Sequence, residues 1–127
     1  MEDIYVARLM STDLVTAMPE TLVEDAAQLL IDNDVGSLPI VDGDNGLVGI
    51  LTTTDFVTIV AHSEPKAETT VERYMTTDLV TTTAQVSVRD AADYMVANDC
   101  HHLPVVGESG QLIGMVSSAD QIGRAHV

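Results

Sequence analysis

The heptapeptide MSTDLVT (residues 10–16) returns as MTTDLVT (residues 75–81), at an offset of 65 positions. At the same offset, and without a gap, GILTTTD (residues 49–55) falls on GMVSSAD (residues 114–120). A solenoid buries a continuous core only with three or more repeats, so two copies favour a different arrangement. The repeat therefore predicts two related units that pack against each other through their sheets about a pseudo-two-fold axis.

Both copies contain the same series of predicted elements, which makes each one a β-α-β-β-α unit of an α+β fold. In the first copy these are a short helix ending at Met10, a strand at Leu14–Thr16, a helix at Leu22–Asn33, strands at Leu38–Asp42 and Leu47–Thr52, and a closing helix at Thr53–Ala61. In the second they are a short helix ending at Met75, a strand at Leu79–Thr81, a helix at Val88–Asn98, strands at Leu103–Val106 and Gln111–Val116, and a closing helix at Ser118–Ala125. Apolar residues at helical spacing and turn residues between short apolar runs support these assignments.

Hydroxyl residues mark the predicted helix starts. Thr21 and Glu24 have the spacing of a capping box, and Ser87 precedes the corresponding helix of the second copy. A polar stretch that contains Pro65 separates the copies. The predicted divisions are repeat 1 with its lead-in helix at residues 1–62, a linker at residues 63–70, and repeat 2 at residues 71–127.

The composition predicts a small cytoplasmic protein with an aliphatic core. Hydrophobic residues make up 46% of the 127 residues, yet there is no Trp and only one Phe. No apolar run reaches the roughly 18 residues of a membrane-spanning helix, and the acidic start MED lacks the layout of a signal peptide. The single Cys100 is compatible with a reducing compartment.

The charge balance is strongly acidic. Asp and Glu number 20 against 5 Lys and Arg, giving a formal net charge of −15. Phosphate backbones and anionic lipids repel such a chain, so neither nucleic acid nor a membrane is expected as a partner. Acids dispersed along the whole chain, with a single Lys, favour a salt-adapted cytoplasm in which screening removes the self-repulsion.

The stretch Gly49–Asp55 has two interpretations. Thr52 and Asp55 have the spacing of a capping box, which is a structural role. A strand that runs into a helix start also presents free backbone N–H groups and a positive dipole end, which suit an anionic ligand. The recurrence of the motif at Gly114–Asp120 favours the ligand interpretation.

The run Cys100-His101-His102 contains residue types that bind metals, but its geometry does not favour a metal site. Successive residues that enter a strand point to opposite faces, so at most two of the three could share an ion. Structural zinc needs four ligands, and no partner cluster exists elsewhere in the chain. Cys100 occupies the position of Val35 in the first copy, which indicates a small core residue. We therefore predict neither a metal site nor a catalytic residue.

In this order, and present twice, the motifs resemble those of a tandem cystathionine β-synthase (CBS) domain pair, also called a Bateman module. The resemblance covers nearly the whole chain from Val6. It rests on Met-x-x-Asp-Leu-Val-Thr at the start of each copy, Asp-Ala-Ala in each first helix, Leu-Pro-Ile-Val or Leu-Pro-Val-Val in the strand, and the two closing motifs.

The resemblance implies clefts between the repeats that bind adenosine-containing ligands such as AMP, ATP or S-adenosylmethionine. Asp55 and Asp120 would accept hydrogen bonds from ribose hydroxyls, since a carboxylate accepts two hydroxyl donors at once. Thr52 and Ser117 would contact phosphate. The adenine and the cleft walls would be contacted by Val15, Thr16, Ser37, Leu38 and Pro39 in one cleft, and by Val80, Thr81, His101, His102, Leu103 and Pro104 in the other.

The sequence departs from the family pattern where phosphate binders often carry Arg or Lys. Before the closing Asp it has Thr54 and Ala119, and before Leu-Pro it has Ser37 and His102. This favours a monophosphate over a polyphosphate, with Mg²⁺ expected only alongside a polyphosphate. A ligand without phosphate, such as S-adenosylmethionine, also fits, because a sulfonium suits an acidic protein.

The expected function is that of a non-catalytic sensor, which signals through the geometry of a homodimer to an unknown effector protein. The closing helices at Asp55–Ala61 and Asp120–Ala125 are the expected dimer contact. A CBS pair that serves as an interaction scaffold, with empty or degenerate ligand sites, is the alternative. An enzyme is not expected, because no nucleophile and base can be paired from the chain.

Overall fold

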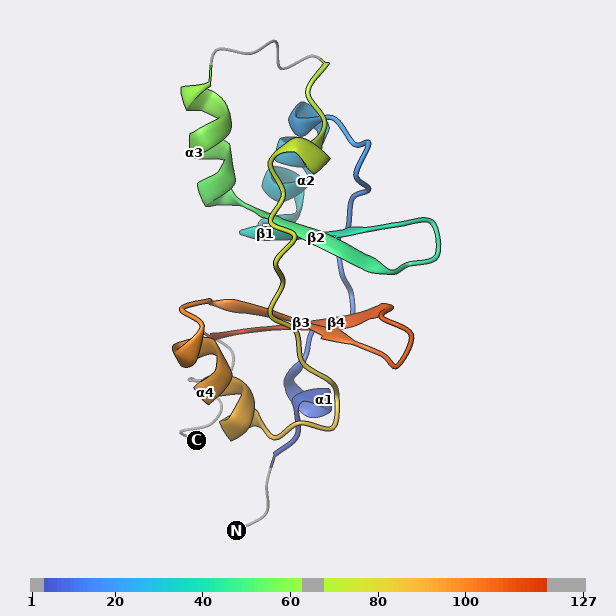
Figure 1. Cartoon of the computed structure of the whole chain (residues 1–127), viewed down its shortest axis with the longest axis vertical. Coiled ribbons are helices and arrows are strands. Elements are labelled where there is room, and N and C mark those ends of the chain that lie inside the picture. Colours follow the sequence, from blue (N-terminus) through green and yellow to red (C-terminus); the bar gives the residue numbers. More distant parts are fainter. Residues whose placement is uncertain (1–3, 63–67, 119–127) are drawn as a thin grey trace. The chain divides into compact units, whose positions relative to one another are not determined.

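The computed structural model describes residues 4–62 and 68–118, and the chain forms two compact units (Figure 1). The β1–β2 unit is built from Val15–Leu79, and the β3–β4 unit from Met1–Leu14 together with Val80–Val127. The boundaries of these two units differ from the boundaries of the two sequence repeats. The first residues of each repeat, here called its lead-in segment, are residues 1–14 and 71–79. Each lead-in segment belongs to the unit that contains the sheet of the other repeat.

The β1–β2 unit contains an antiparallel hairpin with helices around it. Its elements are α2 (Val23–Asn33), β1 (Ser37–Val41), β2 (Leu47–Thr52), α3 (Thr53–Ala61) and the 3₁₀ helix η2 (Val71–Arg73). The turn between the strands is closed by Asp42, whose carboxylate accepts hydrogen bonds from the backbone N–H groups of Asp44 and Gly46, each at 2.9 Å. Asn45 takes a left-handed conformation there (φ 63°), which Asn tolerates better than most residues. The predicted hairpin and the predicted bounds of α3 are confirmed.

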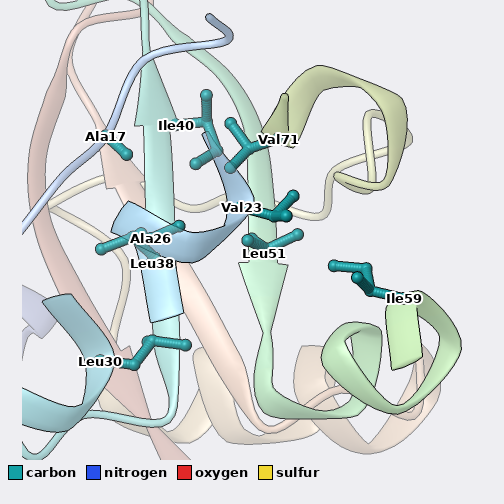
Figure 2. Close-up of a cluster of buried hydrophobic side chains, with 9 residues drawn as sticks. All are labelled: Ala17, Val23, Ala26, Leu30, Leu38, Ile40, Leu51, Ile59 and Val71. Carbon is teal, nitrogen blue, oxygen red and sulfur yellow. The ribbon is translucent and has the colours of Figure 1, made fainter. Parts of the chain in front are cut away.

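Figure 2 shows the core of this unit, which is entirely aliphatic, as the composition predicts. Val23, Ala26 and Leu30 bury one face of α2 at spacings of three and four residues. Val71 of η2 is fully buried among them, so the segment after the linker is part of this core. The cluster consists of Ala17, Val23, Ala26, Leu30, Leu38, Ile40, Leu51, Ile59 and Val71.

The β3–β4 unit repeats this arrangement. Its elements are α1 (Val6–Leu9), α4 (Val88–Ala97), β3 (His102–Val106) and β4 (Leu112–Ser117). The strand register is equivalent in the two units, with Ser37 opposite Thr52 in one and His102 opposite Ser117 in the other. A register shift follows at the same repeat position, after Ile40 and after Val105. The predicted internal repeat is therefore confirmed for the two hairpins and the helices that precede them.

Each lead-in segment crosses the second strand of its unit, and this crossing explains why the repeat contains both a Met and a Gly at fixed positions. The backbone groups of Thr76 and Ile50 exchange hydrogen bonds of 3.0 and 2.9 Å, and Ser11 pairs with Met115 in the same way. At this crossing a Cβ on Gly49 would lie 2.6 Å from the Met75 sulfur, and one on Gly114 would lie 2.6 Å from the Met10 sulfur. Both positions need glycine because no Cβ fits beneath the methionine.

Two local predictions are wrong. Thr21 does not cap α2, because its Oγ1 accepts a hydrogen bond from the Met18 N–H at 3.0 Å in the preceding turn. The segments 14–16 and 79–81 are not strands, since each meets β1 or β3 only through one bridging residue, Ala17 or Thr82. In contrast, Ser87 accepts a hydrogen bond from the Asp90 N–H at 3.1 Å and caps α4 as predicted. The predicted helix at 118–125 lies outside the described residues, apart from Ser118.

Candidate ligand site

The motif at the end of β2 places Thr52 at the N-cap of α3 and Asp55 in its first turn. The Thr52 N–H donates a hydrogen bond to Asp55 Oδ2 at 2.8 Å, and the Thr52 hydroxyl lies 3.3 Å from the same oxygen. The structural interpretation of the motif, a capping box, is therefore correct. Both bonds use Oδ2, which leaves Oδ1 of the half-buried carboxylate as a possible acceptor for a ligand hydroxyl.

The backbone donors at this helix start are partly occupied. The Thr52 N–H is held by Asp55, and the Thr53 N–H donates to the Gly36 carbonyl at 3.1 Å. An anion at the start of α3 would therefore find two amides already used by the protein. The contact between Thr53 and Gly36 instead fixes the entrance of β1 next to the start of α3.

Two further segments of the β1–β2 unit lie at this end of the hairpin. Ser37 pairs with Thr52 across the sheet, and the Ala17 N–H donates to the Pro39 carbonyl at 3.1 Å. The second bond places Val15 and Thr16, both half-buried, beside β1. The structure thus brings together the first set of predicted site residues. Leu38 is different: it is 0% exposed and packs in the core, so only its backbone is available to a ligand.

The second set has the equivalent arrangement in the β3–β4 unit. His102 lies opposite Ser117, and the Thr82 N–H donates to the Pro104 carbonyl at 2.9 Å, which places Val80 and Thr81 beside β3. Leu103 is a core residue with 0% exposure, like Leu38. The predicted ribose ligand of this set, Asp120, lies outside the described residues.

His101 takes the place of Gly36 in this second set. Its carbonyl accepts the Ser118 N–H at 2.9 Å, and its Nδ1 lies 3.4 Å from the Ser118 hydroxyl. The ring is exposed, so it can meet a ligand at the entrance of β3. Neither set of predicted site residues contains Lys or Arg, and the two histidines of the second set are their only basic side chains.

The run Cys100–His102 lies between the end of α4 and the start of β3. Within the described ranges, no three His, Cys, Asp or Glu side chains are grouped so that they could hold a metal ion. Burial raises the pKa of the Cys100 thiol, and the nearby Asp99 carboxylate raises this pKa further. The thiol therefore stays protonated at neutral pH and is a poor nucleophile.

A pocket lies beside α4, and the sequence analysis does not predict it. Its volume is about 360 Å³, and it is lined by Ala92, Met95, Val96, Asp99, Cys100, His101 and Ser118.

Known proteins place this fold and its motifs in one family. The profile described as CBS domain matches residues 6–62 and again 71–120. The chain therefore belongs to the CBS domain family and carries the domain twice, as the sequence motifs predict. Within the described ranges, no helix is sufficiently long and apolar to cross a membrane.

Relatives with similar sequences differ in length and context. The chain is 35% identical over 115 residues to an uncharacterized 17.7 kDa protein of Acidianus ambivalens, and the match covers 91% of this chain and 69% of that protein. It is 32% identical over 124 residues to a homoserine O-acetyltransferase of Methanosalsum zhilinae, covering 98% of this chain. That match spans only 24% of the enzyme.

Similar solved structures include proteins with adenosine-containing ligands. The CBS domain pair of protein MJ0100, in complex with 5′-methylthioadenosine and S-adenosyl-L-methionine, has a TM-score of 0.87 and 29% identity, covering 98% of this chain and 97% of that one. CBSX2 in complex with AMP has a TM-score of 0.83 and 26% identity, covering 97% and 96%. Ligands with an adenosine group are thus bound by proteins of closely similar fold.

Proposed function

We propose that this chain is a non-catalytic regulatory module that binds an adenosine-type ligand through Asp55 and the residues around it. The observation that carries the proposal is the arrangement at the start of α3. There Thr52 holds one carboxylate oxygen of Asp55, while Ser37 and the segment 15–16 lie at the same end of the hairpin. A carboxylate fixed in this way is prepared to accept ribose hydroxyls. The ligands of MJ0100 and CBSX2 support the ligand class.

The charge of the site favours a neutral or cationic ligand over a polyphosphate. The predicted site residues include no Lys or Arg, and two amides at the start of α3 are engaged by Asp55 and Gly36. In a chain of net charge −15, each further phosphate adds repulsion. A thioether nucleoside or a sulfonium such as S-adenosylmethionine meets no such penalty. We therefore rank these ligands above AMP, and AMP above ATP.

A thermal-shift series at high salt tests the proposal. The ligands are 5′-methylthioadenosine, S-adenosylmethionine, AMP, ADP, ATP and NAD. A ligand present at a hundred times its Kd stabilises the folded state by about 2.7 kcal/mol, which a melting curve resolves. We expect shifts in the order given by charge, with the two sulfur ligands first. No shift with any of these ligands would contradict the proposal and favour an interaction scaffold with empty sites.

The output of such a module is a change in assembly. A ligand acts on a partner only through its different affinities for two states of the protein, and two geometries of a homodimer are the states proposed here. An effector protein in the cytoplasm would respond to that change. The free thiol of Cys100 is consistent with a reducing compartment.

A further inference from the structure

The turn between β1 and β2 (Figure 1) contains the pair Asn45–Gly46. Asn45 is exposed and Gly46 is half-buried, so water reaches the pair. The side-chain amide of an Asn can react with the backbone nitrogen of the next residue, and a following Gly permits this most readily because it has no Cβ to obstruct the approach. The other Asn residues of the chain, Asn33 and Asn98, precede Asp instead. The turn therefore contains the most reactive Asn of the sequence.

The reaction is a cyclisation followed by hydrolysis, and its only co-reactant is water. The Gly46 nitrogen loses its proton to solvent and attacks Cγ of Asn45. The new N–Cγ bond forms, the Cγ–Nδ2 bond breaks, and the side-chain nitrogen takes up a proton from solvent and leaves as ammonia. Water then opens the resulting succinimide. Cleavage of the bond to Cγ gives aspartate at position 45, and cleavage of the bond to the main-chain carbonyl carbon gives isoaspartate.

The folded turn holds the nitrogen that has to attack. The Gly46 N–H donates a hydrogen bond to Asp42 Oδ1 at 2.9 Å. A Cβ on Gly46 would lie 2.9 Å from Asp42 Oδ2 and 3.1 Å from Oδ1, so the whole carboxylate lies against this glycine. A negative group that accepts the N–H disfavours the loss of its proton. The nucleophile of the reaction is therefore kept in its protonated, unreactive form.

The turn between β3 and β4 shows that the same backbone path forms without a carboxylate. At the offset of 65 positions, Gly107 takes the place of Asp42 and Gly110 the place of Asn45. In both turns the first of these residues donates its N–H to the carbonyl four residues later, at 2.9 Å, and accepts the N–H of the second, at 3.1 Å and 3.0 Å. The second residue is left-handed in both, with φ 63° and 81°. The first turn differs by its Asn–Gly pair and by the carboxylate that holds the N–H of that pair.

We propose that Asn45–Gly46 is a site of spontaneous deamidation and that Asp42 is a positioning residue that slows this reaction in the folded protein. The product has a carboxylate in place of the amide, which adds repulsion in a chain of net charge −15. The isoaspartate form also lengthens the main chain by a methylene group. Because the length of a turn sets the register of its hairpin, this form weakens the pairing of β1 with β2. The proposal is independent of the ligand site, since Ser37 and Thr52 pair at the other end of the hairpin.

Peptide mapping by mass spectrometry tests the proposal. The parent protein and Asp42→Ala are incubated at mildly alkaline pH in molar KCl, and the mass gain from amide to acid at position 45 is followed with time. We expect Asp42→Ala to deamidate about 10-fold to 150-fold faster, which is the factor that a hydrogen bond to a charged group contributes. The parent protein in urea, where the bond to Asp42 is lost, should also react faster than the folded parent protein.

Three controls assign the reaction and its cause. Asn45→Gly, which places at position 45 the residue type found at Gly110, should show no mass gain there. Asp44→Ala removes a neighbouring charge but leaves the bond between Gly46 and Asp42, so it should react like the parent protein. The two Asn–Asp pairs are internal standards, and their rates should be equal in the parent protein and in Asp42→Ala.

Amide hydrogen exchange separates protection of the Gly46 nitrogen from simple closure of the turn. The N–H at position 42 donates to the Gly46 carbonyl, so its protection reports whether the turn stays closed. We expect this protection to be the same in the parent protein and in Asp42→Ala, while deamidation at position 45 is faster in the variant. Equal deamidation rates in the two proteins would overturn the proposal. So would faster deamidation accompanied by an equal loss of protection at position 42, or a folded parent protein that deamidates as fast as it does in urea.

Discussion

Thr52 and Asp55 are joined at the start of α3 by a hydrogen bond of 2.8 Å from the Thr52 N–H to Asp55 Oδ2. Under the proposed function, capping and ligand binding make demands on the same carboxylate. One oxygen completes the helix start, and the proposal assigns the other to a ribose. Substitutions at this position must therefore be chosen so that the two roles can be separated.

Asp55→Ala should lower the free energy of unfolding by about 1 kcal/mol, because it removes the cap of α3. Asp55→Asn should lower it by less, since the amide oxygen can still accept the Thr52 N–H. Urea unfolding of the two variants without ligand measures this difference. Asp44→Ala is the matched control, because Asp44 is exposed in the β1–β2 turn and contributes its backbone N–H there. Equal destabilisation by all three variants would contradict the capping role.

Gly49→Ala should destabilise the protein by about 1–3 kcal/mol, because the added methyl group overlaps the Met75 side chain. A Cβ at this position would lie 2.6 Å from the sulfur of Met75 and 3.2 Å from the Thr76 carbonyl oxygen. Gly36→Ala is the control, since a Cβ there would meet nothing within 4 Å. The measurement is the shift in the urea midpoint for each variant.

A double variant tests whether Met75 itself causes the effect. Gly49→Ala/Met75→Ala should lose less stability than the sum of the two single variants, because the small side chain leaves space for the methyl group. Additive losses would contradict the contact between the lead-in segment and β2. The same experiment applies to Gly114 and Met10, where the equivalent distance is also 2.6 Å.

Cys100 should react slowly with iodoacetamide in the folded protein at pH 8. Burial and Asp99 both raise the pKa of its thiol, so the thiolate fraction is lower than in the unfolded chain. The stability of the fold therefore depends on pH. The folded state keeps the thiol proton as the pH rises past the thiol pKa of the unfolded chain, so the free energy of unfolding falls with rising pH above that value. Cys100→Val, which restores the residue found at position 35, should lack this alkaline loss. A native alkylation rate equal to that in urea would contradict the assignment.

Salt should stabilise the fold strongly. The 20 acidic residues repel one another at low ionic strength, and 5 basic residues cannot compensate. Because the Debye length falls from about 30 Å at 0.01 M salt to about 3 Å at 1 M, molar KCl should raise the melting temperature. Circular dichroism melts with and without KCl measure the effect. A melting curve that is unchanged by salt would remove the basis for a salt-adapted source, which remains a prediction.

Much of the fold could be predicted because its signals are local and occur twice. The turn at 43–46 contains the residues that a hairpin turn requires, and α3 begins and ends where its apolar spacing and capping residues predict. The cap predicted at Thr21 is wrong because a hydroxyl can accept a hydrogen bond in a turn as well as at a helix start, and the sequence does not decide which N–H donates to it. A sequence offset defines the repeats but cannot tell which compact unit the first residues of each repeat join.

The candidate site was only partly predictable. Strand pairing brings Ser37 to Thr52, which follows from the hairpin register, but the burial of Leu38 and Leu103 depends on packing that the motif does not encode.

The most direct test of the account is calorimetric titration of 5′-methylthioadenosine into the parent protein and into Asp55→Asn, in molar KCl. A hydrogen bond to a charged group contributes about 1.5–3 kcal/mol, so loss of the carboxylate should weaken binding by about 10-fold to 150-fold. Asp44→Ala should bind like the parent protein. We expect the parent protein to bind and Asp55→Asn to show this loss; equal affinities of the parent protein and Asp55→Asn would contradict the assignment of Asp55 as the ribose acceptor.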